Sequence, residues 1–467
     1  MAPDTSDGVV HGPGARPGFV RRLKAAVTGD PDARFVHLNN FEVERVWGEG
    51  EPGLPGAGLS LNSPTVNRME EVGVLLVDEG DAVILKEAVE PALEEYLRGL
   101  GLAAGRVLTV DRNTPERSVA VDALDSPRLL AELASMADGR THLMPMGVSV
   151  HEERLAAATG LPLAGPSAAV CKHVNGKLFS RALVDRSGLR QVPGTGCRTV
   201  DELAAAIEEH LADGAGPVVV KESLGVSGRG LVVLDSARRG ERLVRMAARR
   251  GARLDVVVER WIDKECDLNY QFLVGRDGSV SFETVKAALT ENGVHRGHLF
   301  PPPLTPAQTA ELETAAQTLG KGLAEAGYFG VVGVDAMLGR DGTLYPCLEI
   351  NARFNMATFQ NRLAERFVLP GRHALATVFD LQPRRVHGFA EVREALGGLL
   401  FAPGAAACPE RARGVLVSNT ATLRAGAAPG RPFPGRLYAV CVGDGPQDVN
   451  ALRSAAARAL EKMVEQA

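Results

Sequence analysis

A glycine-rich stretch at residues 217–234 limits the possible folds of this chain more than any other segment of the sequence does. It reads P-V-V-V-K-E-S-L-G-V-S-G-R-G-L-V-V-L, in which two short β-branched runs flank a loop rich in Gly and Ser. Such a pattern predicts a β-hairpin. Glycines let a loop backbone approach a ligand closely, and its consecutive N–H groups form an anion site. With Lys221 at the end of the first strand, we interpret the hairpin as a flap that covers phosphates. An ordinary hairpin with a mobile tip is the alternative.

Length and composition narrow the classes of protein to consider. The 467 residues suggest about three domains, and a chain that is 45% hydrophobic and 23% charged is ordinary globular material. The net charge of −5 argues against nucleic acid as the main partner. The six cysteines are far apart and form no C-x-x-C, so neither a zinc knuckle nor a disulfide framework is expected. Without a long apolar run or a signal peptide, we expect a soluble, cytoplasmic protein with no membrane partner.

Strands and helices alternate in the first third of the chain. Residues 1–30 are rich in Gly, Pro and Asp, and we expect a disordered tail with one short helix near Val20–Val27. Residues 31–165 then predict an α/β domain with a parallel sheet. Its expected strands are Arg34–Leu38, Val72–Val77, Arg106–Val110 and Thr141–Pro145, and its expected helices are Ala88–Leu100 and Ser126–Met136.

The rest of the chain predicts further mixed structure, so the fold class is α/β with α+β character. A polar stretch at Ala287–Pro303 is unusually long for a loop, and such loops tend to be functional. Helical stretches are expected from Arg353 to about residue 380, followed by a small separate lobe at 385–467. The other expected elements are helices Cys171–Ser187, Asp201–Leu211, Ser236–Arg250 and Thr305–Ala326, strands Asp255–Glu259, Asp267–Val274, Ser279–Val285, 330–338 and 343–351, and, in the lobe, strands Gly398–Phe401, Arg413–Val417 and Leu437–Val442 and a terminal helix with Val449, Leu452, Ala456, Leu460 and Met463 on one face.

Two neighbouring strands carry a cluster of hard oxygen ligands. Asp335 lies in V-V-G-V-D-A-M, whereas Glu349 and Asn351 lie in Y-P-C-L-E-I-N-A-R. Residues i and i+2 of a strand face the same side, so the hairpin lets all three side chains converge. Mg²⁺ usually takes one or two carboxylates together with substrate phosphates. Arg353 continues this face, where it would stabilise charge on a transferred phosphoryl group or an acyl intermediate. A solvated polar face is the alternative, but the neighbouring residues are apolar.

Other signatures of catalysis are missing or weak. The chain has no G-x-x-x-x-G-K-[ST], G-x-S-x-G or H-E-x-x-H, which excludes a P-loop enzyme and gives no support for the other two classes. His295 and His298 have H-x-x-H spacing, a weak metal signal, and solvated or phosphate-facing histidines are favoured instead.

Taken in order, these residues resemble the ATP-grasp superfamily over about residues 165–380. The resemblance rests on Lys177, on Lys221 with G-V-S-G-R-G, on Glu259, on Asp335 and on E-I-N-A-R at 349–353. It implies ATP held between two antiparallel sheets. It also implies a pre-ATP-grasp domain at 31–165, an ATP-grasp domain at 166–384 with a lid subdomain at about 190–262, and a small C-terminal lobe at 385–467.

The same resemblance implies a role for individual residues. The ATP phosphates would be contacted by Lys177, Lys221, Ser227, Gly228 and Gly230. The adenine hinge would be formed by Glu259, Trp261 and Ile262, and the ribose would be bound by Asp267. Mg²⁺ would be bound by Asp335, Glu349 and Asn351. The catalytic residues would be Lys221, Arg353 and Arg296, the last of which lies in the loop Thr290–His298.

A closer similarity is to the pheganomycin-type peptide ligases. N-N-F-E-V-E-R-V-W at 39–47, N-G-K-L-F-S-R-A-L at 175–183 and the C-terminal lobe carry it. It implies a ligase that joins a carboxylate to an amine, each from an amino acid or peptide, through an acyl phosphate in natural-product (antibiotic) biosynthesis. A related branch, similar to the butirosin-pathway ligase, instead loads an amino acid onto a carrier-protein thiol. A phosphotransferase and a non-catalytic nucleotide-binding scaffold stay open, and a homodimer is a family-level expectation.

Overall fold

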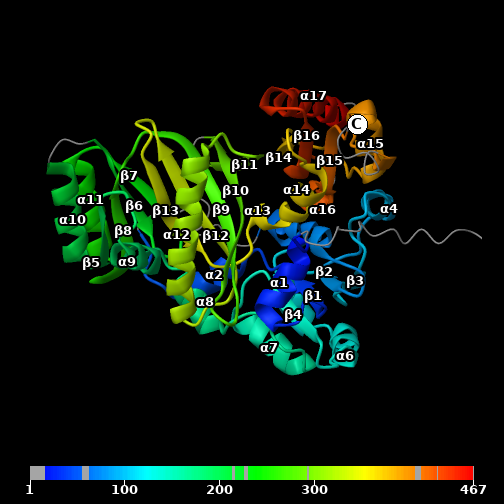
Figure 1. Ribbon diagram of the computed structural model, residues 1–467, viewed down its shortest axis with the longest axis horizontal. Coiled ribbons are helices and arrows are strands. Elements are labelled where there is room, and N and C mark those ends of the chain that lie inside the picture. The colour runs from blue at the N-terminus through cyan, green and yellow to red at the C-terminus, as the bar shows by residue number, and fades with distance from the viewer. Residues whose placement is uncertain are drawn as a thin grey trace, which may run out of the picture.

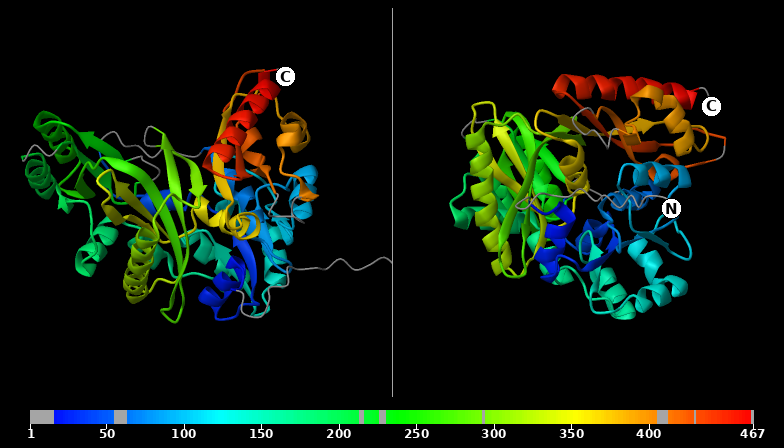
Figure 2. Two further views of the ribbon diagram at one scale, coloured as in Figure 1. Left: turned by 45° about the horizontal axis from the view of Figure 1, so that its top comes forward. Right: turned by 45° about the vertical axis from the view of Figure 1, so that its right-hand side comes forward.

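Three β-sheets organise the part of the chain that the computed structural model describes (Figures 1 and 2). The described residues are 16–54, 63–212, 216–225, 230–291, 294–404, 412–428 and 430–465. Two sheets have four strands each and the third has eight. None of the helices in these ranges is long and apolar enough to span a membrane.

The first sheet is parallel and confirms the predicted α/β arrangement near the N-terminus. Its strand order is β3-β2-β1-β4, and apolar side chains from helices pack on both faces. It forms the blue and cyan region of Figure 1. Its strands are β1 (Arg34–Leu38), β2 (Ala82–Leu85), β3 (Arg106–Thr109) and β4 (Thr141–Pro145), and the helices around it are α4 (Pro91–Gly99), α5 (Val119–Leu124), α6 (Pro127–Ser135) and α7 (Val150–Thr159).

Two predictions for this region are wrong. The expected strand Val72–Val77 is a 3₁₀-helix, η1 (Met69–Leu76), and β2 takes its place in the sheet. Both runs are short, apolar and fully buried, so periodicity alone cannot separate them. The short helix expected near Val20–Val27 is confirmed as α1 (Phe19–Thr28). Its Phe19, Leu23 and Val27 are buried in the core, so this part of residues 1–30 is not the expected disordered tail. Residues 1–15 lie outside the described ranges.

The second sheet contains the glycine-rich hairpin. Strands β6 (Val218–Glu222) and β7 (Leu231–Leu234) pair antiparallel, which confirms the predicted hairpin. Alternate residues such as Val218 and Val220 pack against the helices α10 and α11, so Lys221 faces the other way. The sheet order is β5-β8-β6-β7. The remaining elements are β5 (Gly194–Thr199), β8 (Arg253–Arg260), α10 (Val200–Ala212) and α11 (Ala237–Ala248).

The third sheet has the order β13-β12-β9-β10-β11-β14-β16-β15. The helix α12 (Pro306–Glu325) packs on one face and begins where the sequence predicted, and Thr305 caps it through a capping box with Gln308. Strands β12 and β13 form the predicted hairpin. The strands are β9 (Lys264–Val274), β10 (Val280–Glu291), β11 (Val294–Phe300), β12 (Gly330–Gly339), β13 (Leu344–Asn351), β14 (His373–Leu381), β15 (Gly414–Asn419) and β16 (Gly435–Gly443).

Long-range pairing overturns three predictions about this sheet. The expected loop Ala287–Pro303 is the second half of β10 together with β11. The expected helical region near residue 380 contains β14, which pairs with both β11 and β16. The expected separate lobe therefore continues the large sheet. Its expected strand Gly398–Phe401 is instead the 3₁₀-helix η2 (Gly397–Leu399) with one bridge to β15, whereas the terminal helix α17 (Pro446–Glu465) is confirmed, with Val464 in place of Met463 among its buried residues.

Short helices complete the fold. The expected helix Cys171–Ser187 is divided at Asn175 and Gly176 into α8 (Ala168–Val174) and α9 (Lys177–Ser187). The others are α2 (Val43–Gly48), α3 (Pro64–Asn67), α13 (Met356–Phe359), α14 (Asn361–Phe367), α15 (Phe389–Leu396) and α16 (Ala421–Arg424).

Candidate active site

Lys221 and Glu259 form an ion pair on the face of the second sheet opposite its helices. The Lys221 Nζ lies 2.7 Å from Glu259 Oε2, across the paired strands β6 and β8. Burial tends to lower the pKa of Lys221, but Glu259 and, more weakly, Glu349 and Asp335 raise it, and the net shift is upward. Lys221 is therefore a fixed positive charge at the root of the hairpin.

Lys177 brings three segments together. It is the first residue of α9, directly after the break at Asn175 and Gly176, and its backbone N–H donates to the Ser223 carbonyl (2.9 Å). Its Nζ donates to the Gly225 carbonyl (2.9 Å) and to Glu349 Oε1 (2.7 Å). A single cation thus links the helix, the glycine-rich loop and β13.

Asp335 and Glu349 face each other across the β12–β13 hairpin, as their register shows. The two Asp335 oxygens accept hydrogen bonds from Asn269 Nδ2 (2.8 Å) and Asn351 Nδ2 (3.1 Å). Burial, followed by the nearby Glu349 carboxylate, raises the pKa of Asp335 to about 6. The structure thus brings together the three residues that the sequence nominated for a metal.

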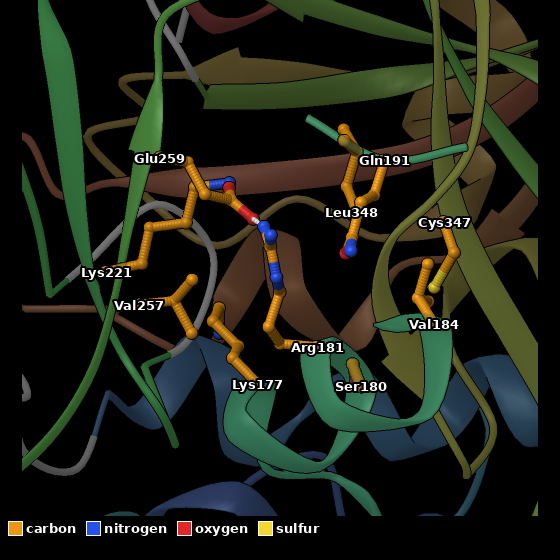
Figure 3. Close-up of a pocket in the computed structure, with 10 residues that line it drawn as sticks. All are labelled: Lys177, Ser180, Arg181, Val184, Gln191, Lys221, Val257, Glu259, Cys347 and Leu348. Atoms are coloured by element: carbon orange, nitrogen blue, oxygen red, sulfur yellow. Dashed lines mark hydrogen bonds and ion pairs between the residues drawn. The ribbon is translucent and has the colours of Figure 1, made fainter. Parts of the chain in front are cut away.

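A pocket that is partly open to solvent lies between the second and third sheets. Figure 3 shows Arg181 reaching from α9 toward Glu259, and its guanidinium lies 3.8 Å from Glu259 Oε1. Sequence reasoning missed Arg181, although it is four residues from Lys177 and so on the same helical face. The lining is Lys177, Ser180, Arg181, Val184, Gln191, Lys221, Val257, Glu259, Cys347 and Leu348.

Among the residues implied for adenine and ribose recognition, Glu259 lines this pocket, whereas Trp261, Ile262 and Asp267 are not part of its lining. Trp261 follows β8 and is 44% exposed, while its backbone N–H donates to the Pro217 carbonyl (2.8 Å); Ile262 comes next in the chain. Asp267, on β9, accepts hydrogen bonds from Lys264 (2.5 Å) and Thr290 (2.9 Å).

Gly230 lies directly before β7 at the end of the glycine-rich loop, and its φ of +77° favours glycine. Its carbonyl accepts the Glu222 N–H (2.8 Å) and closes the base of the loop. Ser227 and Gly228, which the resemblance also assigned to ATP, lie outside the described residues.

The two arginines nominated as catalytic have quite different surroundings. Arg353 is buried beside the carboxylates, where it contacts Asn351 and Glu44. Arg296 lies on β11 and pairs with Asp380 (2.5 Å). Two strands separate β11 from β12, so Arg296 is roughly 14 Å from the strand of Asp335. The structure therefore does not bring Arg296 to the carboxylates, because its expected loop is a strand in the sheet.

The histidine pair also differs from expectation. His298 is buried on β11 and its Nδ1 lies 3.2 Å from Gln360 Nε2, so it is not a solvated histidine. The side chain of His295 lies outside the described part of the structure.

The donor set fits a hard divalent cation that a phosphate ligand helps to hold. Within the described ranges, no cluster of three or more His, Cys, Asp or Glu side chains is arranged to hold a metal by itself. Two carboxylates and an amide do converge, at Asp335, Glu349 and Asn351. Mg²⁺ is commonly held by one or two carboxylates with phosphate oxygens completing its shell.

Comparison with known families identifies the class of this protein. Residues 69–161 match the pre-ATP-grasp domain family, and residues 190–352 match the ATP-grasp domain family. The chain therefore carries a pre-ATP-grasp domain followed by an ATP-grasp domain.

Particular relatives share parts of this chain. The [butirosin acyl-carrier protein]–L-glutamate ligase of Niallia circulans is 30% identical over 204 residues, which are 43% of this chain and 48% of that protein. The carbamoyl phosphate synthase large chain of Xanthomonas axonopodis pv. citri is 27% identical over 201 residues, which are 42% of this chain and 18% of that protein. The chain thus spans about half or less of the length of these curated relatives.

Solved structures share the fold. An N5-carboxyaminoimidazole ribonucleotide synthetase in complex with ADP superposes with a TM-score of 0.52 at 13% identity, over 92% of this chain and 98% of that one. A biotin carboxylase from Campylobacter jejuni gives a TM-score of 0.50 at 14% identity, over 86% of this chain and 89% of that one. At such low identity these two similarities establish the architecture alone.

Proposed function

We propose that this protein is an ATP-dependent ligase that activates a carboxylate as an acyl phosphate and joins it to an amine. One observation carries the proposal: Lys177 and Lys221 converge with Asp335 and Glu349 between two sheets. Two lysines that face two carboxylates suit a nucleoside triphosphate with its metal, because the lysines can pair with the phosphates and the carboxylates with the metal ion.

In this proposal the pocket binds ATP, and Mg²⁺ neutralises phosphate charge when it is bound. Lys177 and Lys221 contact the phosphates, and their present partners Glu349 and Glu259 hold them in place. The adenine lies along Glu259, Trp261 and Ile262, with Asp267 at the ribose and Ser227, Gly228 and Gly230 over the phosphates. The metal ligands are Asp335, Glu349 and Asn351.

The reaction has two steps. A carboxylate oxygen of the first substrate attacks the γ-phosphorus, the bond to the β-phosphate oxygen breaks, and ADP leaves. The amine nitrogen then attacks the acyl carbon, inorganic phosphate leaves, and the nitrogen loses a proton. Lys177 and Lys221 stabilise the phosphoryl oxygens electrostatically, while the two sheets exclude water from the acyl phosphate.

A second candidate differs only in the nucleophile. The butirosin-pathway relative is named for ligating glutamate to an acyl-carrier protein, so a carrier thiol in place of the amine is a specific alternative. In that case the product is a thioester and the partner is a phosphopantetheinylated protein. A role in natural-product biosynthesis and a homodimeric state stay predictions.

A substrate panel with ATP and Mg²⁺ tests this proposal. The purified protein is offered single amino acids, amino-acid pairs and a phosphopantetheinylated carrier protein, while phosphate release and product mass are followed. Phosphate release with a mass gain on a small peptide supports the amide ligase. A mass gain on the carrier protein selects the thioester reaction instead. Nucleotide binding with no turnover across a broad panel contradicts both and favours a non-catalytic scaffold.

A further inference from the structure

Arg353 is almost fully engaged by neighbouring groups. Its Nε (2.9 Å) and one of its terminal nitrogens bond to Glu44, and that same terminal nitrogen donates to Asn351 Oδ1 (3.0 Å). The other terminal nitrogen donates to the Phe354 carbonyl (2.9 Å). A guanidinium held on three sides has a fixed orientation, and it presents few free N–H groups to a substrate.

The contact to Asn351 continues to the carboxylates. Asn351 accepts from Arg353 through Oδ1 and donates through Nδ2 to Asp335 Oδ2 (3.1 Å). Each end of its amide is thereby specified, and the side chain cannot flip without losing both bonds. A continuous chain of hydrogen bonds runs from Glu44 through Arg353 and Asn351 to Asp335.

Glu44 begins this chain from a distant part of the sequence. It lies on α2, which follows the first strand of the parallel sheet and is separated from Arg353 by 309 positions. Val43 and Trp47 anchor α2 in the core, and the Trp47 indole N–H donates to the Val148 carbonyl (2.9 Å). The helix is therefore rigidly seated, so it can hold the Glu44 carboxylate at a defined place.

We propose that Glu44 is a positioning residue for the metal ligands of the proposed function: it orients Arg353, which in turn orients Asn351 and Asp335. This inference rests on the proposed ATP and metal site. Groups that hydrogen-bond to metal ligands fix their direction, and losing one typically weakens metal binding by about 10- to 100-fold. Arg353 acts in this arrangement through Asn351 rather than on the phosphoryl group.

A second ion pair provides the matched control. Glu51, just beyond α2, pairs with Lys172 on α8 (2.5 Å) and so also ties the segment after β1 to the region around α9. It makes no contact with Arg353 or Asn351. If Glu44 only tethers α2 to the rest of the structure, Glu44→Gln and Glu51→Gln should have the same effects. If Glu44 positions the metal ligands, Glu44→Gln alone should have an effect.

The test measures metal binding directly. Mn²⁺ replaces Mg²⁺, and free Mn²⁺ is counted by electron paramagnetic resonance in the presence of a non-hydrolysable ATP analogue. ADP affinity in EDTA is measured by calorimetry on the same proteins. We expect Glu44→Gln to raise the Mn²⁺ dissociation constant about tenfold, and to change ADP affinity by less than about twofold because Lys177 and Lys221 are untouched. Glu51→Gln should leave both constants within about twofold.

Arg353→Lys provides a second route, because lysine keeps the charge opposite Glu44 but lacks the fork that reaches Asn351. It should weaken Mn²⁺ binding at least as much as Glu44→Gln. The double variant should bind Mn²⁺ no more weakly than Arg353→Lys alone, since both changes interrupt the same chain of hydrogen bonds. Unchanged Mn²⁺ affinity in Glu44→Gln, or equal losses in Glu44→Gln and Glu51→Gln, overturns the proposal. Absence of Mn²⁺ and nucleotide binding in the wild-type protein overturns the proposed function as well.

Discussion

At the scale of single residues, Asp335 shows how the site is maintained at a cost to stability. It is an acid placed beside Glu349 among buried side chains, and burial together with that neighbouring carboxylate raises its pKa to about 6, above that of a free aspartate. An acid whose pKa is raised by folding favours the folded state while protonated, so its contribution is present below about pH 4 and is lost as the pH rises through about 6. The charge pair that suits a metal therefore opposes folding at neutral pH.

Asp335→Asn should consequently be more stable than the wild type at pH 8 in EDTA. We expect a gain of about 2 kcal/mol, because at pH 8 the folded state holds an ionised Asp335 beside Glu349 that asparagine does not introduce, and a much smaller difference at pH 4. Urea unfolding at pH 4, 6 and 8 measures this. Asp341→Asn is a control of opposite sign, because the Thr343 backbone N–H lowers the pKa of Asp341. A difference between Asp335→Asn and wild type that does not vary with pH would contradict the charge argument.

Lys221 and Glu349 should be required for turnover but not for folding. Lys221→Ala removes a cation from the proposed phosphate site, and Glu349→Ala removes a partner of Lys177 that is also a metal ligand in the proposed function. We expect each to lower the rate of ADP formation by about 100-fold or more, with an unchanged circular dichroism spectrum. Arg198→Ala, an exposed arginine on β5 of the same sheet, is the control and should retain full activity. Near-normal turnover in Lys221→Ala would show that the site is misassigned.

At the scale of elements, a short segment ties the glycine-rich hairpin to the N-terminal part of the chain. Leu54 is 1% exposed and packs in the core of the second sheet with residues such as Val218 and Leu203. Its N–H donates to Glu222 at the base of the hairpin, and Arg250 donates to its carbonyl (3.1 Å). The hairpin is thus braced from outside its own sheet.

Leu54→Ala should loosen the second sheet selectively. Truncating a buried leucine typically costs 2–5 kcal/mol, and we expect about 2–3 kcal/mol because this segment lies at the margin of the core. Hydrogen exchange should accelerate in β6 and β8 but not in β1 or β4. Met246→Ala on the exposed face of α11 serves as the control. Equal exchange in Leu54→Ala and wild type would mean that the segment does not brace the sheet.

At the scale of the whole molecule, the large sheet joins the middle of the chain to its C-terminal part. β14 pairs with β11 on one side and with β16 on the other, and α17 packs on β14 and β16. The strand order runs from β11 to β14, β16 and β15, so these C-terminal strands continue the sheet of β12 and β13. The C-terminal strands are therefore part of the sheet that carries Asp335.

Removing residues 414–467 should prevent the remainder from folding as a soluble protein. The deletion unpairs one edge of β14 and uncovers apolar residues such as Leu375 and Phe379. An exposed, unpaired apolar strand is prone to aggregate. We expect insoluble protein or high-mass aggregate in size-exclusion chromatography, whereas Arg458→Ala on the exposed face of α17 should behave as wild type. If the truncated protein is soluble and folded, the C-terminal strands are not needed to stabilise the large sheet, and this prediction is wrong.

Local patterns were sufficient for the elements whose contacts are close in the sequence. The hairpins β6–β7 and β12–β13 and the position at which α12 begins were predicted, as was the shared face of Glu349 and Asn351. A turn and an alternating strand place such residues within a few positions of each other, so periodicity and turn residues determine them. The same reasoning led to the convergence of Lys177, Lys221 and the carboxylates, although for the lysines it needed the resemblance to a family.

The sequence by itself therefore determined the α/β class, the hairpins and most of the charged residues of the site. Only the tertiary structure decided that Ala82–Leu85 and not Val72–Val77 is the strand, that Arg296 lies away from the carboxylates, and that Glu44 reaches Arg353. These outcomes depend on which distant segments pack together, and short apolar or charged runs are equally compatible with several partners. The choice is made by the packing of the whole chain, which no local pattern contains.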